Sequence, residues 1–467
     1  MKTLPSIIPT AEQLPLISSN RMGVEVIRGA AGSGKTSTAI LRLRSLAYML
    51  EARFEREEIR RPVRILVLTF NRTLSGYVHQ LAQDQLRRIP NSTITVDTFG
   101  RWAMSHLDYP NVVDEQEAQT QLESLAQGLP LAQSYVAKEV EYLLGRFEPS
   151  NIEAYIATER TGRGAQPRID QGLRRQILDQ VTYPYLEWLR RRDALDWNGV
   201  AVSMAQSRQK LGYDVAIVDE SQDFSANQLR ALRQHLAGDF AATFVVDTVQ
   251  RIYARGFTWA ETGFDMRQAV YHRLRENHRN TIEIAQFASG LLEGIEVEDD
   301  GSLPDLTKAK TRGTQPTVLK GYYRDQVGWV FDNILSVVDP KSETVAFLAP
   351  KGGGYLRWLK EKLRSKGYDY VDITRNPDWP EGDEFIAIST FHSAKGLEFD
   401  HVVILGLGSQ NTDHDDPDLD DQLSVWRRLL AVAVARARRS VTIGYKPGEQ
   451  SDLVQFFKMG SFAEIRV

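Results

Sequence analysis

The sequence contains no cysteine, which excludes disulfide bonds, thiolate catalysis, cysteine-ligated zinc and cysteine-ligated iron–sulfur clusters. It also lacks long hydrophobic runs, since the longest, such as Leu429–Ala435, are far too short to cross a bilayer. The stretch from Met1 to Arg21 has no apolar segment after its single lysine, so it does not resemble a secretory signal. We therefore expect a soluble, cytoplasmic protein that has no membrane partner.

The chain carries no large excess of charge of either sign. Its net charge is −4 over 467 residues, so nothing global predicts binding to nucleic acid, and any such binding must come from local patches. Internal repeats and low-complexity tracts are absent as well. With 42% hydrophobic and 25% charged residues, the composition is that of a globular protein with room for about three domains.

Short aliphatic and β-branched runs alternate with longer helical stretches through most of the chain. Continuous apolar strands separated by helices predict parallel sheets that are covered on both faces. The runs fall into two groups, before and after about residue 275, which predicts two α/β domains. The predicted strands are Val24–Arg28, Ile65–Thr69, Thr93–Val96, Val215–Asp219, Thr243–Asp247, Thr344–Ala349, Phe385–Ser389 and Val402–Leu407.

Residues 108–212 interrupt this alternation, because they hold no convincing buried strand. We interpret them as a helical insertion within the first α/β domain. The helices predicted there are Glu115–Ala126, Leu131–Leu144 and Gln171–Arg192. The resulting domain division is 1–107 with 196–274, then the insertion 108–195, then 275–467.

The insertion contains an arginine-rich stretch at 159–192, with eight arginines against four acidic residues. Tyr183, Tyr185 and Trp188 lie among them. Basic side chains interleaved with aromatic ones suit a phosphate backbone and stacked bases. The same pattern is equally typical of a solvated helix face over its own small core.

The strongest local pattern is Gly29–Thr36 (GAAGSGKT), which directly follows a predicted strand and opens a helix. In such a P-loop, backbone N–H groups wrap the β- and γ-phosphates of a nucleotide, and the helix N-terminus adds its positive end. Lys35 is expected to reach the terminal phosphates, and Thr36 to hold Mg²⁺ through its hydroxyl. The loop itself would bind phosphate through Gly29, Gly32, Ser33 and Gly34.

A second polar cluster, Asp219–Asp223 (DESQD), follows the predicted strand Val215–Asp219. Ligands bind at the carboxyl ends of strands in doubly wound sheets. Asp219 is therefore the expected second Mg²⁺ contact, and Glu220 is placed to orient or deprotonate the attacking water.

Together with further segments, these motifs resemble the superfamily 1 DNA helicases of the UvrD/Rep/PcrA type. The resemblance spans residues 13 to about 445. Its additional segments, in chain order, are Gln13, Thr69–Asn71, Thr98-Phe99, Val246–Tyr253, Asn277–Thr281, Thr390–Phe399, Arg427–Leu429 and Val434–Ala437.

The resemblance implies two RecA-like domains with ATP and Mg²⁺ between them, and translocation with 3′→5′ polarity along single-stranded DNA. By the same resemblance, Gln13 reads the adenine, Glu398 contacts the ribose and Gln250 senses the phosphate. The residues that it places on the DNA strand are Phe70, Asn71, Thr98 and His392. An ATPase that moves must also make hydrolysis depend on domain closure, and Arg279 and Arg436 of the second half occupy the positions for this.

The sequence departs from the family pattern at several points. His278 stands where the family has its adenine-stacking tyrosine, and Ser37 stands where an arginine usually follows the P-loop threonine. The preference for ATP over other nucleotides is therefore less secure than the binding itself. After Tyr253 the usual aromatic is replaced by a segment in which Phe257 or Trp259 either stacks on a base or packs internally.

Relatives in this helicase family insert a second accessory domain, called 2B, in their second RecA-like half, and this sequence has no room for one. Only 374–384, eleven residues containing Pro377 and Pro380, lie between the predicted strand Tyr368–Ile373 and the next strand. That length makes a loop, with no room for an independently packed core. We therefore expect no second accessory domain (2B), and translocation with weak or partner-dependent unwinding.

The motifs fit two activities. The chain is either a helicase in its own right or a nucleic-acid-stimulated ATPase that drives a complex, for example with a nuclease in genome defence. A P-loop kinase or signalling NTPase is excluded, because it does not need a second half with two phosphate-facing arginines. The acidic run 413–421 could suggest a metal site, but a solvated loop explains it better.

Overall fold

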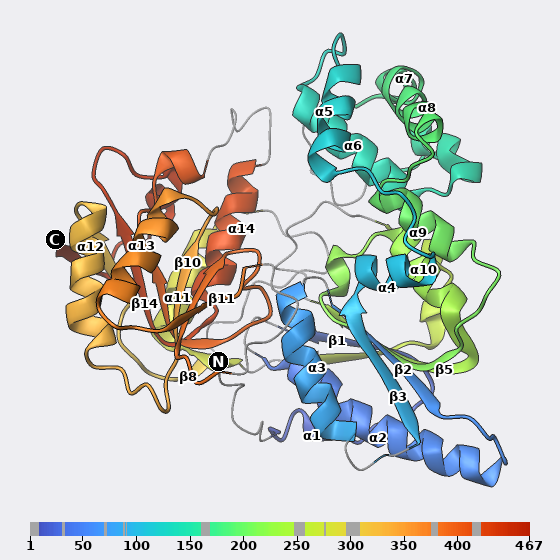
Figure 1. Ribbon diagram of the computed structural model, residues 1–467, viewed down its shortest axis with the longest axis horizontal. Helices are drawn as coiled ribbons and strands as arrows, with labels where there is room; N and C mark the ends of the chain where they lie inside the picture. Colours follow the sequence, from blue (N-terminus) through green and yellow to red (C-terminus); the bar gives the residue numbers. More distant parts are fainter. Residues whose placement is uncertain are drawn as a thin grey trace.

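The computed structural model contains two large parallel β-sheets, a small two-stranded one and a separate cluster of helices (Figure 1). It describes residues 9–29, 33–69, 72–86, 89, 91–159, 169–246, 257–274, 277–295, 309–374, 382–412 and 422–467. Among these residues, no helix is both long enough and apolar enough to cross a membrane. The fold is α/β, as predicted, with two RecA-like sheets.

The first sheet has six strands in the order β3-β2-β4-β5-β1-β6, all parallel. Its strands are β1 (Gly23–Gly29), β2 (Val63–Thr69), β3 (Ser92–Thr98), β4 (Tyr213–Val218), β5 (Leu236–Val246) and β6 (Val270–Leu274). Because β1, β5 and β4 are parallel, the loop after β1 and the polar cluster after β4 open at the same edge of the sheet. Only β5 lies between the two strands. This order therefore brings the two nucleotide motifs together.

Helices cover both faces of the first sheet. Successive side chains along each strand point to opposite faces and are therefore buried in two different cores. Ile65 and Val67 belong to the core under the helices α2 and α3, whereas Leu66 and Leu68 belong to the core under α4, α9 and α10. The bounds are α1 (Leu14–Ile17), α2 (Lys35–Arg56), α3 (Arg72–Leu86), α4 (Phe99–His106), α9 (Trp197–Ala205) and α10 (Ala226–His235). Two covered faces explain why the strands read as continuous apolar runs.

A buried ion pair fixes α2 against β1. Arg42 is 1% exposed and donates to Glu25 Oε1 at 2.6 Å and to Thr243 Oγ1 at 2.7 Å. Burial alone would raise the pKa of Glu25, but the hydrogen bond from His272 and the charge of Arg42 hold it below its usual value. The helix that begins at Lys35 is therefore held at a fixed height above the sheet.

The second sheet has seven parallel strands in the order β11-β12-β10-β13-β14-β9-β15. They are β9 (Thr317–Lys320), β10 (Val345–Ala349), β11 (Tyr370–Asp372), β12 (Ile386–Thr390), β13 (Phe399–Ile404), β14 (Ala437–Tyr445) and β15 (Ala463–Arg466). Four helices pack against it: α11 (Ile282–Leu292), α12 (Tyr323–Val330), α13 (Gly354–Ser365) and α14 (Gln422–Val434). A small two-stranded sheet, β7 (Asn277–Thr281) with β8 (Ala309–Thr311), lies beside α11.

The two halves of the chain, before and after about residue 275, share an apolar interior. One cluster of buried side chains includes residues of α2 and the first sheet together with residues of α11, α14 and the second sheet. Figure 1 shows α14 on the side of the second lobe that faces the first, whereas α12 and the C-terminal end lie on its outer side. Contacts between the halves are therefore part of this structure.

The predicted helical insertion has its own core and stands away from both sheets (Figure 1). Its helices are α5 (Glu115–Leu125), α6 (Gln133–Arg146), α7 (Gln171–Gln176) and α8 (Tyr183–Arg191). The single helix that we predict for Gln171–Arg192 is interrupted by a π-helical turn at Ile177–Thr182. Pro184 explains the interruption, because it has no backbone N–H to donate into a regular helical ladder.

Candidate active site between the two halves

The phosphate-binding loop ends where α2 begins. Gly34 is the residue before the helix and has φ of +74°, a left-handed conformation that favours glycine. A Cβ atom there would also lie 2.4 Å from Gln13 Nε2. Lys35 follows, and its ammonium donates to the carbonyl of Gly29 at 2.8 Å. The lysine therefore already points across the loop in which phosphates would sit.

Gln13 is held against this loop. Its side chain is 5% exposed, its Nε2 donates to the carbonyl of Ser33 at 3.1 Å, and its Oε1 accepts from the backbone of Thr10 at 3.0 Å. The resemblance assigns Gln13 to the adenine, and the structure brings it to Ser33 and Gly34. Gly32 lies outside the described residues.

Thr36 and Asp219 meet above the sheet edge. The Thr36 hydroxyl lies 3.1 and 3.0 Å from the two carboxylate oxygens of Asp219, which is 1% exposed. Burial, and next the neighbouring charge of Glu220, raise the pKa of Asp219 to about 7. A buried carboxylate of this kind favours a cation beside it.

The donor set fits Mg²⁺. The ion prefers oxygen ligands and is commonly held by one or two protein oxygens together with substrate phosphates and water. Thr36 and Asp219 supply two such oxygens. Among the described residues, no group of three or more histidine or acidic side chains could hold a metal alone, so these two residues would need nucleotide phosphates to complete the shell.

Glu220 lies next to Asp219 in an unusual backbone conformation. Its φ of +51° is left-handed, which is uncommon for a residue with a side chain and is often found at functional sites. Gln222 donates to one of its carboxylate oxygens. Burial alone would raise the pKa of Glu220, but the charges of Lys395, Lys35 and Arg436 hold it below its usual value.

The second half contributes several charged side chains to this region. Arg279 pairs with Glu398, and the charge of Arg279 keeps the pKa of Glu398 low against the opposing effect of burial. Arg436 is 2% exposed, and its guanidinium donates to the carbonyl of Val432 at 3.0 Å and to that of Leu397 at 3.4 Å. Arg436 also acts electrostatically on both Glu220 and Glu398.

Lys395 makes the direct contact between the halves. It belongs to the segment after β12, and its ammonium pairs with Asp223 and lies 3.2 Å from Glu220 Oε2. The ring of charges around Glu220 is thus built from both halves of the chain.

Two family models match this chain. The model of the UvrD/REP helicase N-terminal domain matches residues 10–263, which is more than half of the chain. The chain belongs to the UvrD/Rep helicase family. The model of the UvrD-like helicase C-terminal domain matches residues 374–447, which include the segments around Lys395 and Arg436. The resemblance seen in the sequence is confirmed, and the chain carries the domains of a superfamily 1 DNA helicase.

The other comparisons add little. No curated protein matches the chain significantly. Among solved structures, the C-terminal domain of a possible DNA helicase from Lactobacillus plantarum WCFS1 is similar at 22% identity, over 40% of this chain and 98% of that one. The TM-score is 0.30, which is too low to say anything about the function of this helicase-family chain.

The residues that the resemblance places on the DNA strand are only partly described in this family member. Thr98 ends β3 and caps α4 by accepting from the backbone of Arg101 at 3.4 Å, and His392 is exposed after β12. Phe257 and Trp259 are partly buried, and Trp259 packs edge-on against Phe244 with ring centres 4.9 Å apart. This contact favours internal packing for Trp259. Phe70, Asn71, Gln250 and the side chain of His278 lie outside the described residues, as does the acidic run 413–421.

The arginine-rich stretch of the helical insertion is engaged with the insertion itself. Arg174 donates to backbone carbonyls at 155, 156 and 158, while Arg190 and Arg191 pair with Glu187. Tyr185 is 1% exposed and stacks with Trp188 in the insertion core. These contacts favour a helix face over its own core rather than a strand-binding surface. The arginines at 160, 163 and 168 lie outside the described residues.

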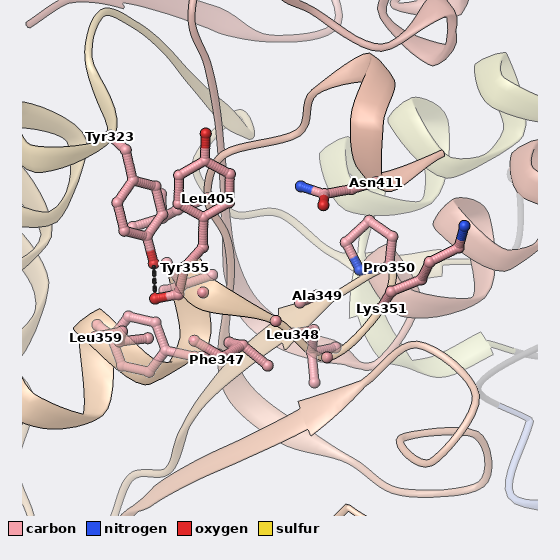
Figure 2. Close-up of a pocket in the computed structure, with 15 residues that line it drawn as sticks. Tyr323, Phe347, Leu348, Ala349, Pro350, Lys351, Tyr355, Leu359, Leu405 and Asn411 are labelled. Carbon is pink, nitrogen blue, oxygen red and sulfur yellow. Dashed lines mark hydrogen bonds between the residues drawn. The ribbon is translucent and has the colours of Figure 1, made fainter. Parts of the chain in front are cut away.

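A pocket in the second sheet is separate from this site (Figure 2). It lies at the ends of β10 and β13, where the Tyr323 hydroxyl donates to the carbonyl of Tyr355 at 2.9 Å. Its volume is about 30 Å³, which holds about one water molecule. None of the residues predicted for the nucleotide lines it, so it is not the nucleotide site.

Sequence reasoning gave no role to Lys395 or Asp223, although both stand inside recognised motifs. A signal was available for Lys395, because it is a lysine in a segment whose neighbours Phe391, Ala394 and Leu397 are apolar. A lysine is rarely buried among such residues unless it has an acidic partner. The identity of that partner could not be read from the sequence.

Proposed function

We propose that this chain hydrolyses ATP in the cleft between its two halves and uses the energy to move 3′→5′ along single-stranded DNA in the cytoplasm. One observation carries the proposal: Lys395 and Arg436 of the second half act on Glu220 of the first. A site completed from both sides makes hydrolysis depend on how the halves are placed. That dependence is what a motor needs.

The proposed roles follow the geometry. Lys35 binds the terminal phosphates, Thr36 and Asp219 hold Mg²⁺, and Glu220 orients the attacking water or takes its proton. Bound Mg²⁺ would neutralise phosphate charge that develops during transfer. Arg279 and Arg436 would stabilise that charge from the opposite wall, with Gln250 as the phosphate sensor. By the resemblance, Gln13, Ser37, His278 and Glu398 would contact the base and ribose of the nucleotide.

The strand would cross both halves at the carboxyl edges of their sheets, where ligands of such sheets bind. The proposed contacts are Phe70, Asn71, Thr98 and His392, with Phe257 preferred over Trp259 as a stacking ring because Trp259 packs on Phe244. We also propose the domain division 1–107 with 196–274, 108–195 and 275–467. The short connection 374–384 supports the absence of a second accessory domain, although 375–381 lie outside the described residues.

The alternative is a nucleic-acid-stimulated motor that needs a protein partner, such as a nuclease, to separate strands. The short connection favours this alternative for unwinding, since a duplex-gripping accessory domain has no place there. Both functions share the same ATPase centre and the same strand path. They differ only in what the isolated chain does to a duplex.

Two assays on the purified chain separate these functions. We expect ATP-dependent release of streptavidin from a biotin at the 5′ end of a single strand and not from the 3′ end, because a 3′→5′ motor runs into the 5′ end. On a tailed duplex, we expect little strand displacement by the chain alone. Release from the 3′ end would refute the polarity, and efficient displacement would refute the partner-dependent alternative. The Lys35→Ala variant is the matched control in both assays.

A further inference from the structure

The contact made by Lys395 is more specific than a general closeness of the halves. Its side chain is only 2% exposed, and the two carboxylates that it meets, Glu220 and Asp223, are 10% and 0% exposed. A buried ammonium loses its hydration, and only paired partners offset this loss. Here both partners come from the opposite half, so the pairing exists only while the halves keep this arrangement.

The lysine belongs to a compact turn that also carries His392. The backbone of Lys395 donates to the carbonyl of His392 at 3.3 Å, and that of Ala394 donates to Thr390 at 3.0 Å. Phe391 anchors the turn by donating to the carbonyl of Ala349 at 2.9 Å. The turn therefore has an exposed side with His392 and a buried side with Lys395, three residues apart. His392 and Lys395 are therefore linked directly by the backbone of one turn.

The position of Lys395 also bears on what Glu220 can do. The same carboxylate oxygen, Oε2, accepts from Gln222 and lies 3.2 Å from the ammonium of Lys395. An oxygen that is engaged in this way is less available to a water molecule. The direction in which Glu220 points therefore depends on where the turn 390–397 stands.

We propose that Lys395 is a positioning residue that couples binding of single-stranded nucleic acid to the placement of Glu220. Its ammonium is a clasp between the halves: it pairs with Glu220 and Asp223, and a strand that contacts the turn at His392 would change this pairing. This inference deepens the proposed function and rests on it. The clasp transmits the signal and does not itself touch the reacting phosphate.

The first test measures how strongly single-stranded DNA stimulates ATP hydrolysis. In Lys395→Met, which keeps the length of the side chain and removes its charge, the ratio of stimulated to basal kcat should fall ~5-fold or more. The dissociation constant for DNA and the KM for ATP should stay within ~3-fold of wild type, because the ammonium pairs with Glu220 and Asp223 and is assigned no contact with nucleotide or DNA. Lys395→Arg should keep most of the stimulation.

Two further variants serve as comparisons: one changes the partner of Lys395, and the other is a surface control. Asp223→Asn weakens the clasp from the other half and should lower the ratio in the same way. Lys360→Met removes a lysine that pairs with Asp372 at the surface of the second half and should leave the ratio unchanged. A wild-type ratio in both Lys395→Met and Asp223→Asn overturns the proposal. So does a loss of basal and stimulated turnover in equal proportion.

The second test needs no turnover. Because the chain has no cysteine, Gln206→Cys and Ser365→Cys place single thiols on exposed positions of the first and second halves for a fluorescent donor and acceptor. Without nucleotide or DNA, Lys395→Met should broaden and shift the distribution of transfer efficiency, and Lys360→Met should not. An unchanged distribution in Lys395→Met overturns the clasp. If wild type shows no stimulation by DNA, the proposed function fails, whereas a shifted distribution still upholds the clasp.

Discussion

Glu220→Gln should lower kcat for ATP hydrolysis by ~10²- to 10⁴-fold while the protein still binds ATP, because the amide cannot take a proton from water. The geometry supports this expectation, since Glu220 is buried beside the Thr36–Asp219 pair and faces cations from both halves. Single-turnover hydrolysis and retention of labelled ATP on a filter measure the two effects separately. The variant should hold unhydrolysed ATP.

Lys35→Ala is the matched comparison for that result. It should also abolish turnover, but by weakening nucleotide binding, because the ammonium that spans the loop is lost. Glu361→Gln, at an exposed position of α13, serves as the control for the substitution itself. Hydrolysis by Glu220→Gln at the wild-type rate would show that another group activates the water.

Arg279→Ala and Arg436→Ala should each lower kcat by ~10³-fold or more, the lower end of the range for removal of an arginine finger. ATP binding should change far less, since these guanidinium groups act on charge that develops in the transition state. Steady-state kinetics with saturating DNA, together with equilibrium binding of a fluorescent ATP analogue, provide both quantities.

The pairing of Arg279 with Glu398 calls for a second substitution at that position. Arg279→Ala leaves the Glu398 carboxylate without this partner, so part of its effect could come from local rearrangement. Arg279→Lys keeps the positive charge and should still lose most of the rate, because a single ammonium lacks the planar fork of arginine. Arg357→Ala, at an exposed position of α13, is the surface control. Substantial DNA-stimulated turnover in both alanine variants would contradict activation by the second half.

Much of the fold could be predicted because buried parallel strands leave a plain apolar signal. β4 is buried along its whole length, and it was found within one or two residues at each end. β6 was not predicted, because it lies at the edge of the first sheet and alternates exposed Tyr271 and Arg273 with less exposed side chains. The same holds for β15, an edge strand whose side chains are mostly exposed. Exposed polar side chains on these two edge strands weaken the signal, whereas the edge strands β3 and β11 were still predicted.

The candidate site shows a similar division. Residues that a motif fixes in sequence, such as Lys35 and Thr36, could be named with their chemistry. Contacts that depend on how the halves meet could not, because nothing in the local sequence of Lys395 identifies Glu220 and Asp223 as its partners. The role of the arginine-rich stretch was also undecided, because whether an arginine faces phosphate or a neighbouring glutamate depends on tertiary contacts such as Arg190 with Glu187.

Single-stranded nucleic acid should stimulate ATP hydrolysis at the site built from both halves. The most direct measurement is steady-state ATP hydrolysis by the purified chain, titrated with a single-stranded oligodeoxythymidine and with a blunt duplex of the same length, at several salt concentrations. We expect the single strand to raise kcat at least ~5-fold. We expect its apparent affinity to fall ~10-fold or more between ~50 and ~200 mM salt, as phosphate contacts release counterions. Equal rates with and without the single strand at low salt would show that single-stranded nucleic acid does not activate this ATPase site.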